Sequence, residues 1–166
     1  MKENSLEITK YIQIAKKKQK EGNIYQANEI YKNLINQKIY TYDLLISYGL
    51  FCKEISNLKI AKNLFFLSIK KYPLKINPYI LLAEILRKEN KINDALKTLF
   101  AAKKIEKFNS DIDYNFAITY KTIKLFQEAI ISIDAALKQQ PENQIYKILK
   151  ADILIESFQL IQISFD

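Results

Sequence analysis

A small residue recurs every 34 positions along this chain of 166 residues. The first column of small residues consists of Ala15, Gly49, Ala83, Ala117 and Ala151, and a second column, twelve residues further on, consists of Ala27, Ala61, Ala95 and Ala129. Eight of the twelve alanines lie in these two columns, so chance is a poor explanation. A period of this length indicates repeats of two helices, which need small side chains where they cross closely.

The residues around the small columns have helical spacing. Tyr79, Leu82 and Ala83, for example, lie at i, i+3 and i+4 and therefore share one helix face. Two glycines and three prolines are too few turn formers for an all-β chain. We predict an all-α chain in which the two helices of a repeat meet at Gly22-Asn23, Ser56-Asn57 and Asn90-Lys91.

The period also predicts the domain organisation. We expect one domain over residues 1–166, with repeats at about 8–41, 42–75, 76–109 and 110–143 and a capping helix at about 144–157. The capping helix would pack through Ala151 and Leu154, and Lys147 and Lys150 would make its outer face polar. The tail, residues 158–166, is apolar and does not fit the scheme; a docked extension, a disordered end and the stub of a longer chain all stay open.

The repeat resembles the tetratricopeptide repeat (TPR), a helix–turn–helix unit of 34 residues, over residues 8 to about 157. In the second repeat Leu45, Tyr48, Gly49, Ala61, Phe65 and Pro73 occupy the family's signature positions. Lys18, Asp113 and Lys107 depart from the pattern in other repeats. The structural signature consists of Ala15, Ala27, Gly49, Ala61, Pro73, Ala83, Ala95, Ala117, Ala129, Pro141 and Ala151. The resemblance implies a right-handed superhelical α-solenoid of antiparallel helix-turn-helix repeats, whose concave face is lined by the first helix of each repeat.

Most catalytic and metal-binding chemistry is missing from the sequence. There is no histidine, the only cysteine is Cys52, and the two glycines are too far apart for a phosphate-binding loop. Cys52 falls on a packing column, so we expect a buried small hydrophobe and not a reactive thiol. We predict a chain that is not an enzyme and needs no cofactor or metal. The sequence shows neither a signal peptide nor an apolar run of about 20 residues, so a cytoplasmic location without a membrane span is expected.

The residues expected to line the groove alternate between apolar and charged types. The predicted partner-binding residues are Ile12, Lys16, Lys20, Ile46, Leu50, Lys53, Ile80, Glu84, Arg87, Tyr114, Ile118 and Lys121. An apolar stripe flanked by lysines suits a partner protein's amphipathic helix or extended peptide with acidic flanks. The alternative is that the apolar column merely packs between neighbouring first helices. Some family members bind the acidic tails of chaperones with a clamp of lysines and asparagines, but the corresponding positions here hold Ile12, Lys16, Ser47, Asn77 and Leu81.

The leading hypothesis is thus a non-catalytic protein–protein interaction scaffold, and two alternatives stay open. Similar bacterial arrays are often fused to glycosyltransferase, sulfotransferase or methyltransferase domains, so the chain could be the arm of a larger system. The net charge of +8 is concentrated in the first three repeats, which suggests an anionic surface or nucleic acid as the partner. Because 25 of the 26 basic residues are lysine and no aromatic stacking platform is evident, nucleic acid is disfavoured. The identity of the partner and the oligomeric state are left open.

Overall fold

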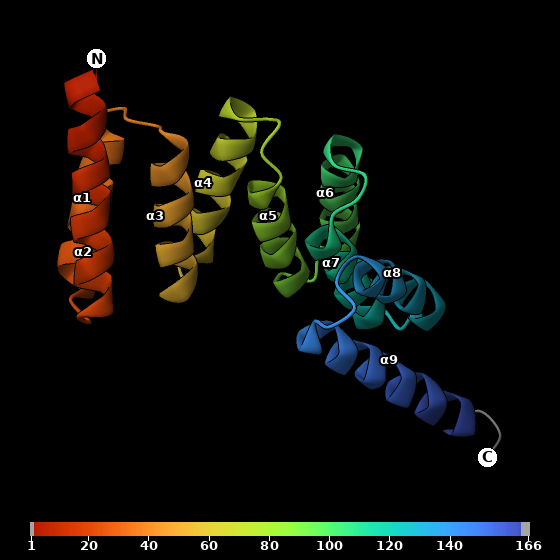
Figure 1. Ribbon diagram of the computed structural model, residues 1–166. Coiled ribbons are helices and arrows are strands. Elements are labelled where there is room, and N and C mark those ends of the chain that lie inside the picture. Colours follow the sequence, from red (N-terminus) through yellow and green to blue (C-terminus); the bar gives the residue numbers. More distant parts are fainter. Residues whose placement is uncertain (1, 164–166) are drawn as a thin grey trace. The chain divides into compact units, whose positions relative to one another are not determined.

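Nine α-helices make up the described part of the chain. The computed structural model describes the backbone of residues 2–163 and the side chains of residues 6–160, and it contains no strand within that range. The helices are α1 (Lys2–Lys20), α2 (Ile24–Asn36), α3 (Tyr42–Glu54), α4 (Leu58–Lys71), α5 (Asn77–Lys88), α6 (Ile92–Ile105), α7 (Ser110–Thr122), α8 (Phe126–Gln139) and α9 (Gln144–Ile163) (Figure 1). This all-α architecture is the one that the sequence period predicts.

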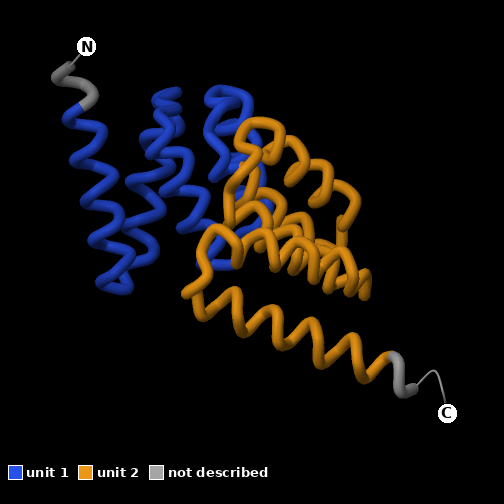
Figure 2. Tube along the Cα trace, turned by 45° about the vertical axis from the view of Figure 1, so that its right-hand side comes forward, with its two compact units in different colours: residues 1–78 blue, residues 79–166 orange. Residues whose placement is uncertain are grey.

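The helices form two compact units, residues 1–78 and residues 79–166 (Figure 2). In the first unit α1 packs against α2 and α3, and α3 packs against α4. In the second unit α7 packs against α6 and α8, and α9 packs against α8. Neighbours in sequence are therefore neighbours in space, as expected when each repeat covers the apolar flank of the one before it.

The two helices of each repeat are joined by a turn that contains one residue at positive φ. These residues recur every 34 positions and are Gly22 (77°), Ser56 (62°), Asn90 (59°) and Lys124 (58°). The residue after each turn position donates its backbone N–H to a carbonyl five residues earlier, as Asn57 does to Cys52 at 2.8 Å. These bonds satisfy carbonyls that a helix end would otherwise leave unpaired. The three predicted turns are confirmed, and a fourth forms at Lys124.

Side-chain caps begin several helices. The Thr41 hydroxyl accepts a hydrogen bond from the Leu44 N–H at 3.3 Å, and the Asn109 side chain accepts one from the Ile112 N–H at 3.1 Å. Such caps satisfy backbone donors that the first turn of a helix leaves free. Pro73 and Pro141 follow the ends of α4 and α8, at the positions where the sequence predicts that these helices stop.

Apart from Ala151, the residues of the two small columns lie inside the fold. Ala15, Ala83 and Ala117 of the first column and all four alanines of the second are essentially inaccessible to solvent. At Gly49 even one extra carbon has no room, because a Cβ there would meet the ring of Phe65, with Cζ at 2.8 Å. The requirement for small residues at the helix crossings therefore has a direct steric cause.

The sequence predicted the wrong packing face for α9. Ala151 and Leu154 are exposed, whereas Tyr146 and Ile153 are buried in a cluster with Ala117, Ala129 and Ile133 among others. The first-column residue of a repeat is covered by the second helix of that repeat, and no helix of the described chain covers this face of α9. The helix also continues past residue 157 to Ile163, so most of the predicted tail is helical. Residues 164–166 lie outside the described part of the chain.

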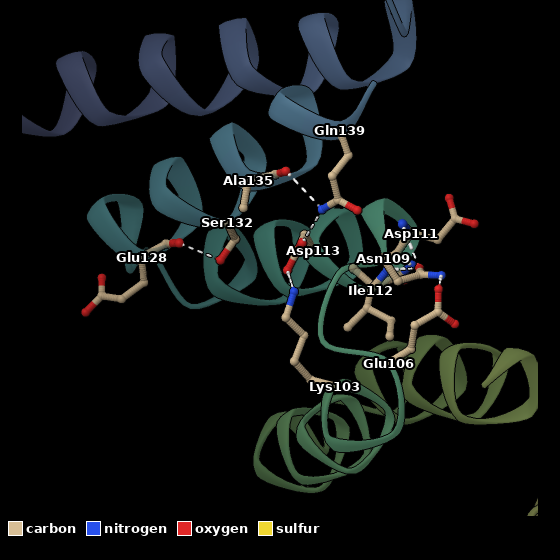
Figure 3. Close-up of polar contacts among 11 residues, drawn as sticks. Lys103, Glu106, Asn109, Asp111, Ile112, Asp113, Glu128, Ser132, Ala135 and Gln139 are labelled. Carbon is tan, nitrogen blue, oxygen red and sulfur yellow. Dashed lines mark hydrogen bonds and ion pairs between the residues drawn. The ribbon is translucent and has the colours of Figure 1, made fainter. Parts of the chain in front are cut away.

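Asp113, which replaces an aromatic residue of the family pattern, joins three helices of the second unit (Figure 3). Its carboxylate accepts hydrogen bonds from Lys103 Nζ of α6 and from Gln139 Nε2 of α8, the latter at 2.9 Å. Asp113 is buried, so both partners compensate the cost of removing its charge from water. The aspartate at this position is thus accommodated by polar contacts with residues on the two neighbouring helices.

Candidate peptide-binding surfaces on the first helices

In the first unit, α1 and α3 line a depression of about 370 Å³. Its lining residues are Lys16, Gln19, Lys20, Tyr31, Tyr42, Asp43, Ile46, Ser47 and Leu50. Four of the six residues predicted for this unit are therefore brought together. Lys16, Lys20 and Leu50 are exposed, which gives the depression a basic edge beside an accessible apolar side chain.

The apolar column in the same unit is not an open surface. Ile12 is 4% exposed and Ile46 is 9% exposed, so both belong to the core. For these two residues the alternative interpretation, packing between neighbouring first helices, is the better one, since α1 packs directly on α3. Lys53 is half-buried. Of the six residues predicted for this unit, Lys16, Lys20 and Leu50 are therefore the exposed ones.

In the second unit, Arg87 lies in an environment shared with Glu84 and Tyr114. Burial lowers the pKa of the Arg87 guanidinium, while the charges of Glu84 and then Tyr114 act in the opposite direction. One guanidinium nitrogen, Nη1, is buried and has no hydrogen-bond partner within the described residues. Ile80 and Tyr114 are half-buried. This arrangement holds a partly buried guanidinium on α5.

Lys121 is predicted from the sequence as a cation for the partner, but its charge is already compensated. Its Nζ lies 2.8 Å from Asp152 Oδ2 and 2.7 Å from Glu156 Oε1, both on α9. Hydrogen bonds to Asp152 and Glu156 raise the pKa of Lys121, partly opposed by burial. Together with Ile118 and Leu149 these residues line a depression of about 400 Å³. Lys121 therefore ties α7 to α9, and its role in partner binding stays a prediction.

A larger depression, of about 670 Å³, lies between the second helices α2 and α4 of the first unit. Its lining includes Ile24, Tyr25, Ile55, Ile60 and Leu67. Tyr25 is largely exposed, and Ile24, Ile55 and Ile60 are partly so. Sequence reasoning missed this surface because it considered only the first helices. The sequence does contain a signal for this surface. Apolar residues lie directly beside the turns, and these residues do not belong to the small columns.

Cys52 is buried, as predicted, among aromatic residues. Burial raises the pKa of its thiol to about 11, an effect that a hydrogen bond with Tyr48 reduces. Burial likewise raises the pKa of Tyr31 and of Tyr48 to about 12. The rings of Tyr31 and Tyr48 stack with centroids 5.2 Å apart. At neutral pH these groups are uncharged and contribute to the apolar core.

We expect Cys52 to be nearly inert in the native protein. At pH 8 a thiol with a pKa of about 11 is almost fully protonated, so its reaction with Ellman's reagent should be about 100-fold slower than that of a free cysteine, or slower still. In denaturant one thiol per chain should react rapidly. A fast native reaction would contradict the burial of Cys52 on the inner face of α3.

Sequence comparison alone does not relate this chain to known proteins. No helix among the described residues is both long and apolar enough to cross a membrane. Neither a family model nor a curated protein matches the sequence.

Solved structures do match. A tetratricopeptide repeat protein from Parabacteroides merdae aligns with a TM-score of 0.82 at 12% identity, over 92% of this chain and 59% of that one. A thermophilic TPR protein of Thermus thermophilus aligns with a TM-score of 0.74 at 12% identity, over 90% of this chain and 82% of that one. In the Cut9–Hcn1 structure the match has a TM-score of 0.74 at 21% identity, over 89% of this chain but 30% of the other. The chain therefore has the tetratricopeptide repeat fold that its 34-residue period predicts.

Proposed function

We propose that this chain is a non-catalytic scaffold that binds a segment of a partner protein on the surface of its first helices. The depression between α1 and α3 is the primary contact in this proposal. It is supported by the exposed Lys16, Lys20 and Leu50 at one site, which offer two cations and an apolar contact to a ligand. Peptide grooves commonly combine an apolar anchor with charges that select the flanking residues.

The charge distribution supports a partner with acidic flanks. Residues 1–78 contain 14 basic and 6 acidic residues, whereas residues 79–166 contain 12 of each. The whole net charge of +8 therefore belongs to the first unit. A positive field of this kind accelerates the approach of an acidic segment and disfavours basic ones.

Arg87 is the proposed second contact, within the second unit. The Arg87 side chain is half-buried, and a carboxylate of the partner would compensate its charge. Arginine is better suited than lysine to such a contact because its planar guanidinium can bind both carboxylate oxygens.

Affinity capture from the source cell, followed by mass spectrometry, tests the proposal. The test variant is Lys16→Glu/Lys20→Glu/Leu50→Ser, which changes exposed residues of the α1–α3 depression. The matched control, Lys59→Glu/Lys70→Glu/Phe66→Ser, likewise replaces two lysines by glutamate and one apolar residue by serine, at exposed positions of α4. The test variant should lose the partner, with Kd raised at least about tenfold, and the control should retain it.

Two results would contradict this assignment. Equal loss in both variants would mean that total charge, and not the α1–α3 depression, governs capture. Unchanged recovery by the test variant, with helicity intact by circular dichroism, would remove the depression from the binding surface.

A further inference from the structure

The depression between α2 and α4 forms a groove along the second helices of the first unit. Its lining residues recur every three or four positions on each helix, so one stripe of each helix faces it. The two stripes consist of Ile24, Asn28, Lys32 and Ile35 on α2 and of Ile60, Asn63, Leu64 and Leu67 on α4. We call this depression the α2–α4 groove. None of its lining residues also lines the α1–α3 depression, so it is a separate surface.

The α2–α4 groove exposes apolar side chains at the end where both helices begin. Tyr25 is 78% exposed, and Ile24, Ile55 and Ile60 are each 37% exposed. From Ile24 to Ile35 the groove is about 16 Å long, the length of a helix of about three turns. A concave apolar surface of this size between two helices suits the apolar face of a third helix.

The charges on α2 and α4 select an acidic occupant. The only carboxylate on the two helices is that of Glu29, whereas they carry five lysines, Lys32, Lys59, Lys62, Lys70 and Lys71. Among the described residues that line the groove there is no aspartate or glutamate, and the exposed Lys32 is one of them. Neither helix has an acidic residue in its first turn, so the partial positive charges of both N-termini, at the exposed end of the groove, add to the lysines.

We propose that the α2–α4 groove binds an amphipathic helix of a partner protein, with its apolar face in the groove and acidic residues along its edges. Its apolar side chains pack on Tyr25, Ile35 and Ile60, and one of its carboxylates lies beside Lys32. Because the α2–α4 groove and the α1–α3 depression share no lining residue, the first unit can hold two partner segments at once.

Other occupants fit the α2–α4 groove less well. A second copy of this chain that paired through the same two helices would bring its own five lysines against these, and like charges repel. An anionic lipid surface is flat, so it would reach the exposed Tyr25 but not the buried Leu64. Nucleic acid binds mainly through its phosphates, for which the apolar lining offers only Lys32 as a cation.

Titration of the full chain with two synthetic peptides tests the proposal. The first peptide is an amphipathic helix of about 14 residues with leucines on one face and glutamates on the other, and the second has lysine in place of each glutamate. The glutamate peptide should bind with a Kd below about 1 mM, at least about tenfold more tightly than the lysine peptide. In the amide NMR spectrum of the chain, the signals that shift should belong to α2 and α4.

Two variants of the groove and one control accompany the titration. Tyr25→Ser/Lys32→Glu should raise the Kd of the glutamate peptide at least about tenfold, without loss of helicity, because both side chains are exposed. The matched control, Tyr11→Ser/Lys10→Glu, makes the same two substitutions at exposed positions of α1 outside the groove and should bind as the wild type does. Asn63→Glu adds a carboxylate at an exposed position of the groove, so it should weaken binding of the glutamate peptide and strengthen binding of the lysine peptide.

Equal binding of the two peptides, or no binding of the glutamate peptide up to about 1 mM, would overturn the proposal. Equal weakening in the control would overturn it as well, because total charge would then govern binding. Amide shifts confined to α1 and α3 would remove the α2–α4 groove and leave the α1–α3 depression as the binding site. Phosphatidylglycerol vesicles that bind the wild type but not Tyr25→Ser/Lys32→Glu, without any binding of the glutamate peptide, would assign the groove to a membrane surface instead.

Discussion

Gly49→Ala is expected to lower the free energy of unfolding by about 1–2 kcal/mol, although alanine is the better helix former. The added Cβ would collide with the ring of Phe65, which is fully buried in the core. Overpacking of a dense core usually costs about 1–3 kcal/mol, and the helix propensity of alanine offsets part of this cost. Urea unfolding followed by circular dichroism measures the difference.

A double-mutant cycle with Phe65→Leu identifies the cause. The residue 16 positions after the small column is Leu99 for Ala83 and Ile133 for Ala117, both smaller than phenylalanine, although it is Tyr31 for Ala15. In the Phe65→Leu background, Gly49→Ala should therefore be neutral or slightly stabilising. The coupling energy should be about 1–3 kcal/mol. Additive effects of the two substitutions would contradict a direct steric contact between residues 49 and 65.

Lys103→Met is expected to destabilise the chain by about 3 kcal/mol, because it removes the cation that compensates the buried Asp113 carboxylate. Methionine keeps most of the side-chain volume, so packing loss contributes little. Gln139 still donates to Asp113 at 2.9 Å, but a neutral amide cannot replace the positive charge. Thermal and denaturant unfolding both measure the loss.

The double variant Lys103→Met/Asp113→Leu is the control for this prediction. It removes both charges and leaves no buried ion without a partner, so most of the lost stability should return. If Lys103→Met alone costs under about 0.5 kcal/mol, the pair behaves as an ordinary surface ion pair and Asp113 does not tie α6, α7 and α8 together.

The accuracy of the sequence predictions differs between the repeat core and the binding surface. The helix pairs, their turns and the buried state of Cys52 follow from residues spaced within one 34-residue unit. By contrast, Lys121 has the same place in its repeat as Arg87, yet its charge is neutralised by Asp152 and Glu156 on α9. Ile12 and Ile46 likewise have the spacing of surface contacts but are buried. Such differences depend on which neighbour covers a position.

The sequence by itself determined the all-α architecture and the places where helices cross, because a small residue is required at every close crossing and helical spacing is local. Only the tertiary structure decided which faces remain open. α9 repeats the small first-column residue of the earlier first helices, but no other helix of the second unit covers the face that carries Ala151. The same kind of residue is therefore buried at Ala117 and exposed at Ala151. Burial is a property of neighbours in space, and residues far along the chain supply them.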